Sequence, residues 1–298
     1  MFVVAVVAVA GCTVPSTWPD GTVPQVPPIG LNGMAEVAGS SASEVWAADY
    51  FGHQLLRFDV ATGEILERHG GLCDTDDVVV APDGSLVATC PGDGTVVRLP
   101  AGGGPTEVLA TVGNGVNPIA LEPAGEAVVV GFGTAEHDTL VRVPLDGGPV
   151  QTVASGLPVL NGFGFGPDGL LYAPTGGLGG VFGGGGLISI DVSTGAVHPI
   201  PLHFDDPGKS GLDFAVGVEV GADGTVYVAQ GLAPAVYAVD PSSGHATLVG
   251  ASPLPMADNL VVLSDGRIVL SGFFGNGYVT FRPDGHGGWT GDLSHVGS

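Results

Sequence analysis

The sequence predicts an all-β protein, a six-bladed β-propeller of four-stranded antiparallel blades. One pattern, an apolar run, a tight turn and a second apolar run, recurs at steps of about forty residues, the length of a propeller blade. A second series of turns keeps the same phase, and no long stretch places apolar residues at helical spacing. Glycines gather at the turns, 53 among 298 residues, while valine fills the runs between them.

The two series of turns divide each repeat into four strands. The first series separates the first strand from the second, at Ser43, Gly84, Gly125, Gly169, Gly224 and Gly266. The second separates the third strand from the fourth, at Thr62-Gly63, Gly103-Gly104, Gly147-Gly148, Thr194-Gly195, Ser243-Gly244 and His286-Gly287. We therefore expect blades at 31–71, 72–112, 113–155, 156–201, 212–251 and 254–298.

Several loops are expected on one face, where the inner strands begin at the central channel. These loops carry Tyr50, Phe51 and His53, then Glu136, His137 and Asp138, then the Gly-rich segment 175–186 and the insertion 201–213. Loops that gather over one mouth of a scaffold commonly bind ligands or cover them. Function is therefore expected at this face.

The charge balance excludes some partners. Seven Lys and Arg stand against 30 Asp and Glu, a net charge of −23. Nucleic acid would be repelled, because phosphate contacts supply most of its affinity, and an anionic membrane surface is disfavoured for the same reason. Divalent cations or cationic ligands are compatible with this charge. The alternative explanation is an acidic surface that promotes solubility.

The N-terminal segment predicts export. Residues 1–12 read as a signal peptide, with an apolar run too short to cross a bilayer and a lipobox-like end at Cys12, which would carry lipid. Ordinary cleavage after residues 8–10 is the alternative. Residues 13–30 are Pro-rich and predict a stiff tether to the propeller at 31–298. We expect a protein of the bacterial envelope, periplasm or exterior. Its only contact with the membrane would be the N-terminal lipid anchor.

Two further cysteines, Cys73 and Cys90, lie in the second repeat. Antiparallel pairing brings the two ends of this repeat's first hairpin together, and an exported protein meets an oxidising compartment. We expect a disulfide between them, with two buried free thiols as the alternative.

A polar column is expected where the inner strands begin. The residue eight before each turn and its successor are Ala35-Glu36, Asp76-Asp77, Asn117-Pro118, Asn161-Gly162, Val216-Gly217 and Asp258-Asn259. Converging carboxylate and carboxamide oxygens suit Ca²⁺ or another divalent cation, whereas the lack of a His or Cys cluster disfavours zinc and copper. The alternative is that Asn and Asp only cap the strand starts. The candidate metal ligands are Glu36, Asp76, Asn117, Asn161, Asp258 and Asn259.

Three stretches resemble a known family: NGFGFGPDGLLYAP (161–174), DDVVVAPDGSLVATC (76–90) and DNLVVLSDGRIVLSGF (258–273). They are similar to the senescence-marker-protein/gluconolactonase (regucalcin-like) family and its paraoxonase-like relatives. The resemblance implies a six-bladed propeller with Ca²⁺ in its channel that hydrolyses lactones or related esters.

Carried over by position, the resemblance implies Glu36, Asn117 and Asn161 as ligands, and Asp258-Asn259 resembles the paraoxonase pair. The chain departs from the family in lacking its Glu-Gly-Pro in the first blade. It also has Val216 where the family implies an Asp ligand.

The expected chemistry is metal-assisted hydrolysis of a lactone or ester. The cation would polarise the carbonyl, and Asp76 or Asp258 would take a proton from water, with His53 or His137 as alternatives at the rim. No Gly-x-Ser-x-Gly elbow is present, which disfavours a serine hydrolase.

The alternative is a non-enzymatic propeller that binds a protein, peptide or glycan by the same face. Four aromatic residues there, Tyr50, Phe51, Phe273 and Phe274, would serve such contacts. In either case we expect a monomer.

Overall fold

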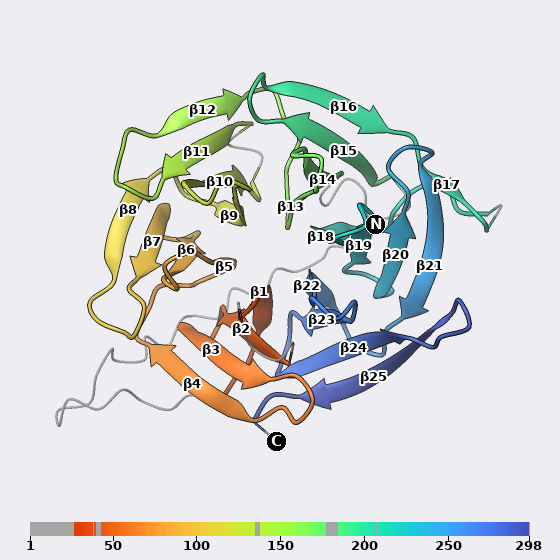
Figure 1. The fold of residues 1–298 in the computed structure, drawn as a ribbon, viewed down its shortest axis with the longest axis horizontal. Coiled ribbons are helices and arrows are strands. Elements are labelled where there is room, and N and C mark those ends of the chain that lie inside the picture. Colours follow the sequence, from red (N-terminus) through yellow and green to blue (C-terminus); the bar gives the residue numbers. More distant parts are fainter. Residues whose placement is uncertain are drawn as a thin grey trace, which may run out of the picture.

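The computed structural model describes residues 27–37, 39, 43–134, 138–176, 184–206 and 208–297. It confirms the prediction of an all-β fold with six antiparallel four-stranded blades in a ring (Figure 1). None of the described segments is a helix that is long and apolar enough to span a membrane. The expected signal peptide and Cys12 lie outside the described residues.

Each blade is one consecutive run of strands, numbered from the channel outward. The first three blades comprise β1 (Leu31–Glu36), β2 (Glu44–Asp49), β3 (Gln54–Asp59) and β4 (Ile65–Gly70); β5 (Val78–Val80), β6 (Leu86–Cys90), β7 (Thr95–Leu99) and β8 (Glu107–Thr111); and β9 (Val116–Leu121), β10 (Ala127–Phe132), β11 (Leu140–Pro144) and β12 (Gln151–Ala154). The last three comprise β13 (Gly164–Phe165), β14 (Leu171–Thr175), β15 (Gly186–Asp191) and β16 (Ala196–Ile200); β18 (Ala215–Val220), β19 (Val226–Gln230), β20 (Ala235–Val239) and β21 (His245–Ala251); and β22 (Ala257–Val262), β23 (Ile268–Gly272), β24 (Gly277–Pro283) and β25 (Trp289–His295).

The tight turns follow from glycine and aspartate in the sequence. Gly84 adopts a φ of 80° and donates its N–H to the Ala81 carbonyl, a backbone conformation that residues with a Cβ rarely adopt. Asp83 accepts a hydrogen bond from the Ser85 N–H and closes the same turn. Turns of this kind fix the register between β5 and β6.

Apolar side chains fill the space between neighbouring blades. The cluster between the second and third blades includes Val87 and Val96 on one side and Val128 and Val130 on the other, all fully buried. Because both faces of the inner strands are covered, their sequences are almost continuously apolar. A polar residue on an inner strand therefore marks either the channel or a structural need.

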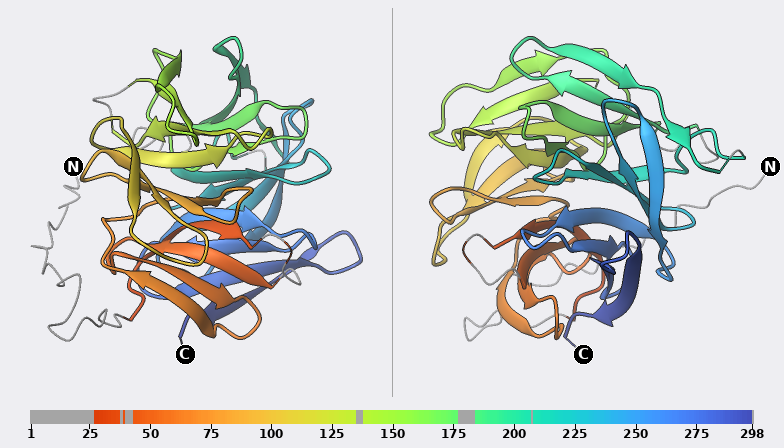
Figure 2. Two further views of the ribbon diagram at one scale, coloured as in Figure 1. Left: turned by 60° about the vertical axis from the view of Figure 1, so that its left-hand side comes forward. Right: turned by 45° about the vertical axis from the view of Figure 1, so that its right-hand side comes forward.

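The ring closes without exchange of a strand between the first and last blades. These blades lie side by side (Figure 2), and the Phe58 and Tyr278 rings contact each other across them at a tilt of 51°, with centroids 5.1 Å apart. The Tyr278 hydroxyl donates to the Val60 carbonyl at 2.9 Å, and the Gly297 N–H donates to the Gly63 carbonyl at 2.8 Å. Closure therefore depends on packing and on a few hydrogen bonds.

The insertion at 201–213 lies partly on the outer edge of the fifth blade. Its strand β17 (His203–Phe204) pairs in parallel with β21, and Asp205 lies 2.9 Å from His245 Nε2. The expected placement over the channel face is wrong for this strand, because the outer edge of β21 offers free backbone groups to pair with.

Candidate metal and active site at the upper channel mouth

The six inner strands begin at one end of the channel, here called the upper mouth. The residues at equivalent positions there form one ring, the upper ring, which consists of Asn32, Asp76, Asn117, Asn161, Val216 and Asp258. The Asn32 Nδ2 donates to Asp76 Oδ1 at 2.8 Å, and the Asn117 side chain also bonds to Asp76. The Asp258 carboxyl is close enough to Asp76 for the charge of Asp76 to raise its pKa. The structure thus brings together polar groups from blades that are far apart in sequence.

Glu36 does not belong to the upper ring. It is the last residue of β1, and its carboxylate accepts hydrogen bonds from the Ser264 N–H at 3.0 Å and the Ser264 hydroxyl at 2.8 Å. The first blade has a longer turn: Met34 pairs with Ala47, thirteen residues on, whereas Val78 pairs with Ala88, ten residues on. Counting eight residues back from Ser43 therefore stops at Ala35, three residues short of Asn32, the residue that occupies the ring.

A second polar layer lies one residue further along the inner strands. Asp77 and Asn259 hydrogen-bond to each other there, and both are more than nine-tenths buried. They fit because the facing strands carry glycine. A Cβ on Gly33 would lie 1.8 Å from Asp77 Oδ1, and a Cβ on Gly162 or Gly217 would lie 2.8 Å from Asn259 Oδ1.

Glu219 adds a carboxylate that the sequence analysis missed. It lies on β18 and, with Asp77 and Asn259, lines a cavity of about 340 Å³ in the channel. A Cβ on Gly164 would lie 2.8 Å from Glu219 Oε2, so the neighbouring strand leaves room for this side chain. The signal in the sequence is a single Glu within the apolar run AVGVEV of an inner strand.

Burial dominates the electrostatics of these carboxyl groups. It raises the pKa of Asp76 to about 7, and together with the charge of Asp76 it raises that of Asp77 to about 7. Burial and the charge of Asp77 raise the pKa of Glu219 to about 8. Burial, then the charges of Asp76 and Asp77, raise that of Asp258 well above its usual range. Each of these groups would bind a cation more readily than it would carry an isolated charge.

In the part of the chain that the structure describes, no cationic side chain forms an ion pair with these four carboxyl groups. None of the ion pairs that the structure shows among its described residues includes Asp76, Asp77, Glu219 or Asp258. A buried carboxylate without a partner is costly, so such a group is either protonated or bound to a cation from solution.

Asn32 supplies a further indication of a ligand. Its side chain is fully buried, yet its Oδ1 has no hydrogen-bond partner among the described residues. An amide oxygen left without a partner costs about 1–3 kcal/mol, and an oxygen atom beside a carboxylate is a suitable ligand for a hard cation.

Acidic groups alone do not complete a metal site. The described residues contain no group of three or more His, Cys, Asp or Glu side chains that could hold a metal ion. A cation at the upper ring would therefore need carboxamide oxygens beside carboxylate oxygens. Asn32, Asp76, Asn117 and Asp258 offer such a mixed set, which fits Ca²⁺ in chemistry.

The other residues predicted from the sequence to belong to the site are Asn161, His53 and His137. Asn161 occupies its ring position, but its Oδ1 accepts the Gly162 N–H at 2.9 Å. His53 lies in the loop after β2 with a φ of 51°, and its carbonyl accepts the Leu72 N–H at 3.0 Å. His137 lies outside the described residues.

A disulfide joins Cys73 to Cys90, with the two Cα atoms 5.7 Å apart. Cys90 ends β6, so the bridge holds the segment that leads to Asp76 against the second blade. Within this segment Asp74 accepts hydrogen bonds from the Gly92 N–H at 2.9 Å and from the Tyr50 hydroxyl at 3.3 Å. The bridge thus limits the freedom of the residues that approach the upper mouth.

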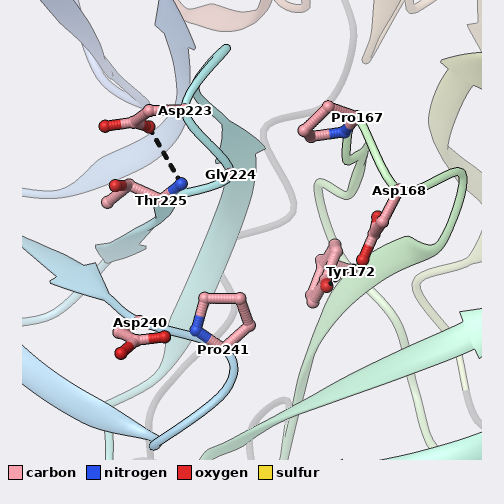
Figure 3. A pocket seen from close by; sticks show the side chains of 8 residues that line it. All are labelled: Pro167, Asp168, Tyr172, Asp223, Gly224, Thr225, Asp240 and Pro241. Carbon is pink, nitrogen blue, oxygen red and sulfur yellow. Dashed lines mark hydrogen bonds between the residues drawn. The ribbon is translucent and has the colours of Figure 1, made fainter.

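A different acidic pocket lies between the fourth and fifth blades (Figure 3). It has a volume of about 300 Å³ and contains Asp168, Asp223 and Asp240. Each carboxylate accepts a hydrogen bond from a backbone N–H two residues further on, which closes its own turn. These groups are explained by turn formation and do not form the candidate site.

Comparison with known proteins identifies the fold. No protein-family profile matches the sequence, and no curated protein matches it. The structure resembles a gluconolactonase from Xanthomonas campestris at 19% identity and a TM-score of 0.64, over 90% of this chain and 87% of that one. It also resembles virginiamycin B lyase from Staphylococcus aureus at 14% identity and a TM-score of 0.62, over 90% of this chain and 85% of that one.

A propeller in a nidogen/laminin complex is similar as well, at 12% identity and a TM-score of 0.65, over 90% of this chain and 92% of that one. Enzymes and a protein of a binding complex thus share this architecture. At these identities the likeness shows the fold alone, a six-bladed propeller, while function has to be argued from the site.

Proposed function

We propose that the protein binds a divalent cation, Ca²⁺ in the first place, at the upper ring and hydrolyses a lactone or ester there. The observation that carries the proposal is the convergence of Asn32, Asp76, Asn117 and Asp258, with buried carboxyl groups that lack a cationic partner and an Asn32 oxygen without a hydrogen bond. The likeness to a gluconolactonase supports the choice of reaction.

The residues have distinct roles in this proposal. Asn32 and Asn117 hold the Asp76 carboxyl in place through their side-chain amides. A bound cation would supply Lewis-acid stabilisation of the negative charge that develops on a carbonyl oxygen. Asp258 has two roles in this proposal: its negative charge would help to hold the cation, and its carboxylate is the candidate base that takes a proton from water.

Export forms part of the proposal. A Cys73–Cys90 disulfide is stable in an oxidising compartment, and the leader and tether predicted for residues 1–30 would deliver the propeller there. We propose that the protein acts outside the cytoplasm, on a substrate that diffuses to it.

The first test is calorimetric titration of the full propeller with Ca²⁺, beside thermal melts with and without a chelator. We expect one binding event and a melting temperature that falls when Ca²⁺ is removed. Asp258→Asn should weaken binding at least tenfold, because it removes the charge of a ligand and keeps its shape.

Asp168→Asn is the matched control, because Asp168 lies in the surface pocket of Figure 3. It should leave the titration unchanged. Absence of both Ca²⁺ binding and a chelator effect would refute the metal site. A panel of γ- and δ-lactones and simple esters then tests turnover.

A non-enzymatic binding propeller is the second candidate, favoured by a cluster of aromatic residues near the upper mouth, of which Phe274 is exposed. It predicts Ca²⁺ binding without turnover of any lactone or ester. Asp258→Asn would then lower the melting temperature and change no rate.

A further inference from the structure

Four aromatic residues, here called the aromatic patch, meet between the first and last blades: Tyr50, Phe51, Phe273 and Phe274. The rings form a continuous set of contacts. Phe51 contacts Tyr50 and Phe273 edge to face, with centroids 5.2 and 5.5 Å apart. Phe274 lies 4.8 Å from Phe273 and stacks nearly parallel to Phe51 at 6.3 Å.

The aromatic patch is attached to the segments that carry the upper ring. A Cβ on Gly30 would lie 2.5 Å from the Phe51 ring, and Gly30 precedes Asn32 by two residues. The Phe273 N–H donates to the Met256 carbonyl at 3.1 Å, and Met256 precedes Asp258 by two residues. The patch therefore adjoins the upper mouth at β1 and β22, which lie next to each other in the ring (Figure 1).

Tyr50 connects the aromatic patch to the carboxyl groups. Its hydroxyl donates to Asp74 Oδ2 at 3.3 Å, while its ring contacts Phe51. Burial and the charges of Asp74 and Asp76 raise the pKa of Tyr50 to about 12, so the phenol stays neutral. The aromatic patch thus reaches Asp74, two residues before Asp76 of the upper ring.

Packing of the fold does not require all of this apolar surface. Phe274 is 53% exposed, and Ile29, whose carbonyl accepts the Gly275 N–H, is 44% exposed. Val108 on the outer strand β8 is 62% exposed and belongs to no such aromatic cluster. Single exposed apolar residues are ordinary, whereas a cluster beside a polar site is typical of a ligand-binding surface.

We propose that the substrate carries an alkyl or aryl group that binds the aromatic patch while its carbonyl group faces the upper ring. This inference rests on the proposed function and names its substrate class: lactones or esters with an apolar substituent, in place of polyhydroxylated sugar lactones. Sugar hydroxyl groups placed against Phe51, Phe273 and Phe274 would lose their hydrogen bonds to water without replacement.

Binding of two lactams tests the inference without turnover. δ-Valerolactam and 6-pentylpiperidin-2-one share a ring whose amide resists hydrolysis, and only the second has an alkyl chain. Calorimetry with Ca²⁺ present should show about tenfold tighter binding of the pentyl compound, because part of the chain leaves water on a half-open surface.

Phe274→Ser should remove most of this preference, and Phe274→Leu should retain it, because Leu restores an apolar contact. Val108→Ser is the matched control: it removes a similarly exposed apolar side chain from β8, outside the aromatic patch, and should change neither affinity. Thermal melts of all variants verify that the fold survives.

Equal affinity for both lactams, with Ca²⁺ bound, would overturn the inference and leave the proposed hydrolase intact. A pentyl preference that Phe274→Ser removes, in a protein without Ca²⁺ binding, would support apolar binding at the patch and overturn the hydrolase proposal. If Phe274→Ser abolishes cosedimentation with phosphatidylcholine vesicles and leaves lactam binding unchanged, the patch contacts membrane and the inference is wrong.

Discussion

Asp77 in the channel and Asp240 in a surface turn are the same residue type with opposite acid–base behaviour. Asp77 accepts hydrogen bonds from the Val78 N–H at 2.9 Å and the Ile119 N–H at 3.2 Å. Asp240 accepts them from the Ser242 N–H and hydroxyl and from the Ser243 hydroxyl. Yet the pKa is raised to about 7 for Asp77 and lowered to about 2 for Asp240.

The difference shows which physical effect decides at each place. Hydrogen bonds favour the ionised form of both carboxyl groups, but Asp77 is only 6% exposed and lies near the carboxyl groups of Asp76, Glu219 and Asp258. There the cost of burying charge exceeds the gain from hydrogen bonds. The Asp240 carboxylate remains hydrated, so burial costs it little and its hydrogen bonds lower its pKa. Many of the thirty acidic residues can therefore contribute to solubility while a few prepare a site for a cation.

The largest expected effect is a dependence of metal-free stability on pH. The folded-state pKa values of Asp76 and Asp77, about 7, and of Glu219, about 8, exceed the unfolded values near 4. The folded protein thus holds protons that the unfolded chain releases, and its stability falls as pH rises from about 4 to 8. At about 1.4 kcal/mol for each pKa unit, Asp76 alone should cost roughly 3 kcal/mol between pH 5 and 7, and Asp77 and Glu219 should add to this loss.

Urea unfolding in the presence of a chelator measures this loss. Saturating Ca²⁺ should reduce it, since the cation replaces the protons and binds more tightly as pH rises. Metal-free stability that is flat or increasing over this range would contradict the view that the channel carboxyl groups are strained by burial.

Gly33→Ala should have the next largest effect on stability, because the added methyl group would clash with Asp77 in the channel. Its Cβ would lie 1.8 Å from Asp77 Oδ1 and 2.5 Å from the Asp77 Cα, so the backbone of the neighbouring strand would have to move. We expect a loss of about 2–3 kcal/mol in urea unfolding at pH 5. Gly208→Ala is the control, because its nearest atom would be Asp206 Oδ1 at 3.3 Å. Equal losses in both variants would show that the second polar layer is not tightly packed.

The sequence was sufficient for the fold and for part of the site. Turn glycines and apolar runs predicted the six blades, because both depend on local backbone preferences. The polar column was predicted by counting back from the same turns. This prediction was wrong only in the first blade, where a longer turn led to Glu36 in place of Asn32. Glu219 was missed because its role depends on Gly164 of the neighbouring blade, a contact that no local pattern records.

Asp240→Asn should have the smallest effect, and it separates the channel from the surface. Asn keeps one oxygen to accept the turn hydrogen bonds, so we expect a slightly lower melting temperature, by the same amount at pH 5 and at pH 8. Asp258→Asn should instead flatten the pH dependence, since burial and the charges of Asp76 and Asp77 strain that carboxyl group. If both variants flatten it equally, the cause is repulsion across a surface with a net charge of −23. The contrast between Asp77 and Asp240 would then lose its consequence for stability, and only Ca²⁺ titration could distinguish the channel from the turns.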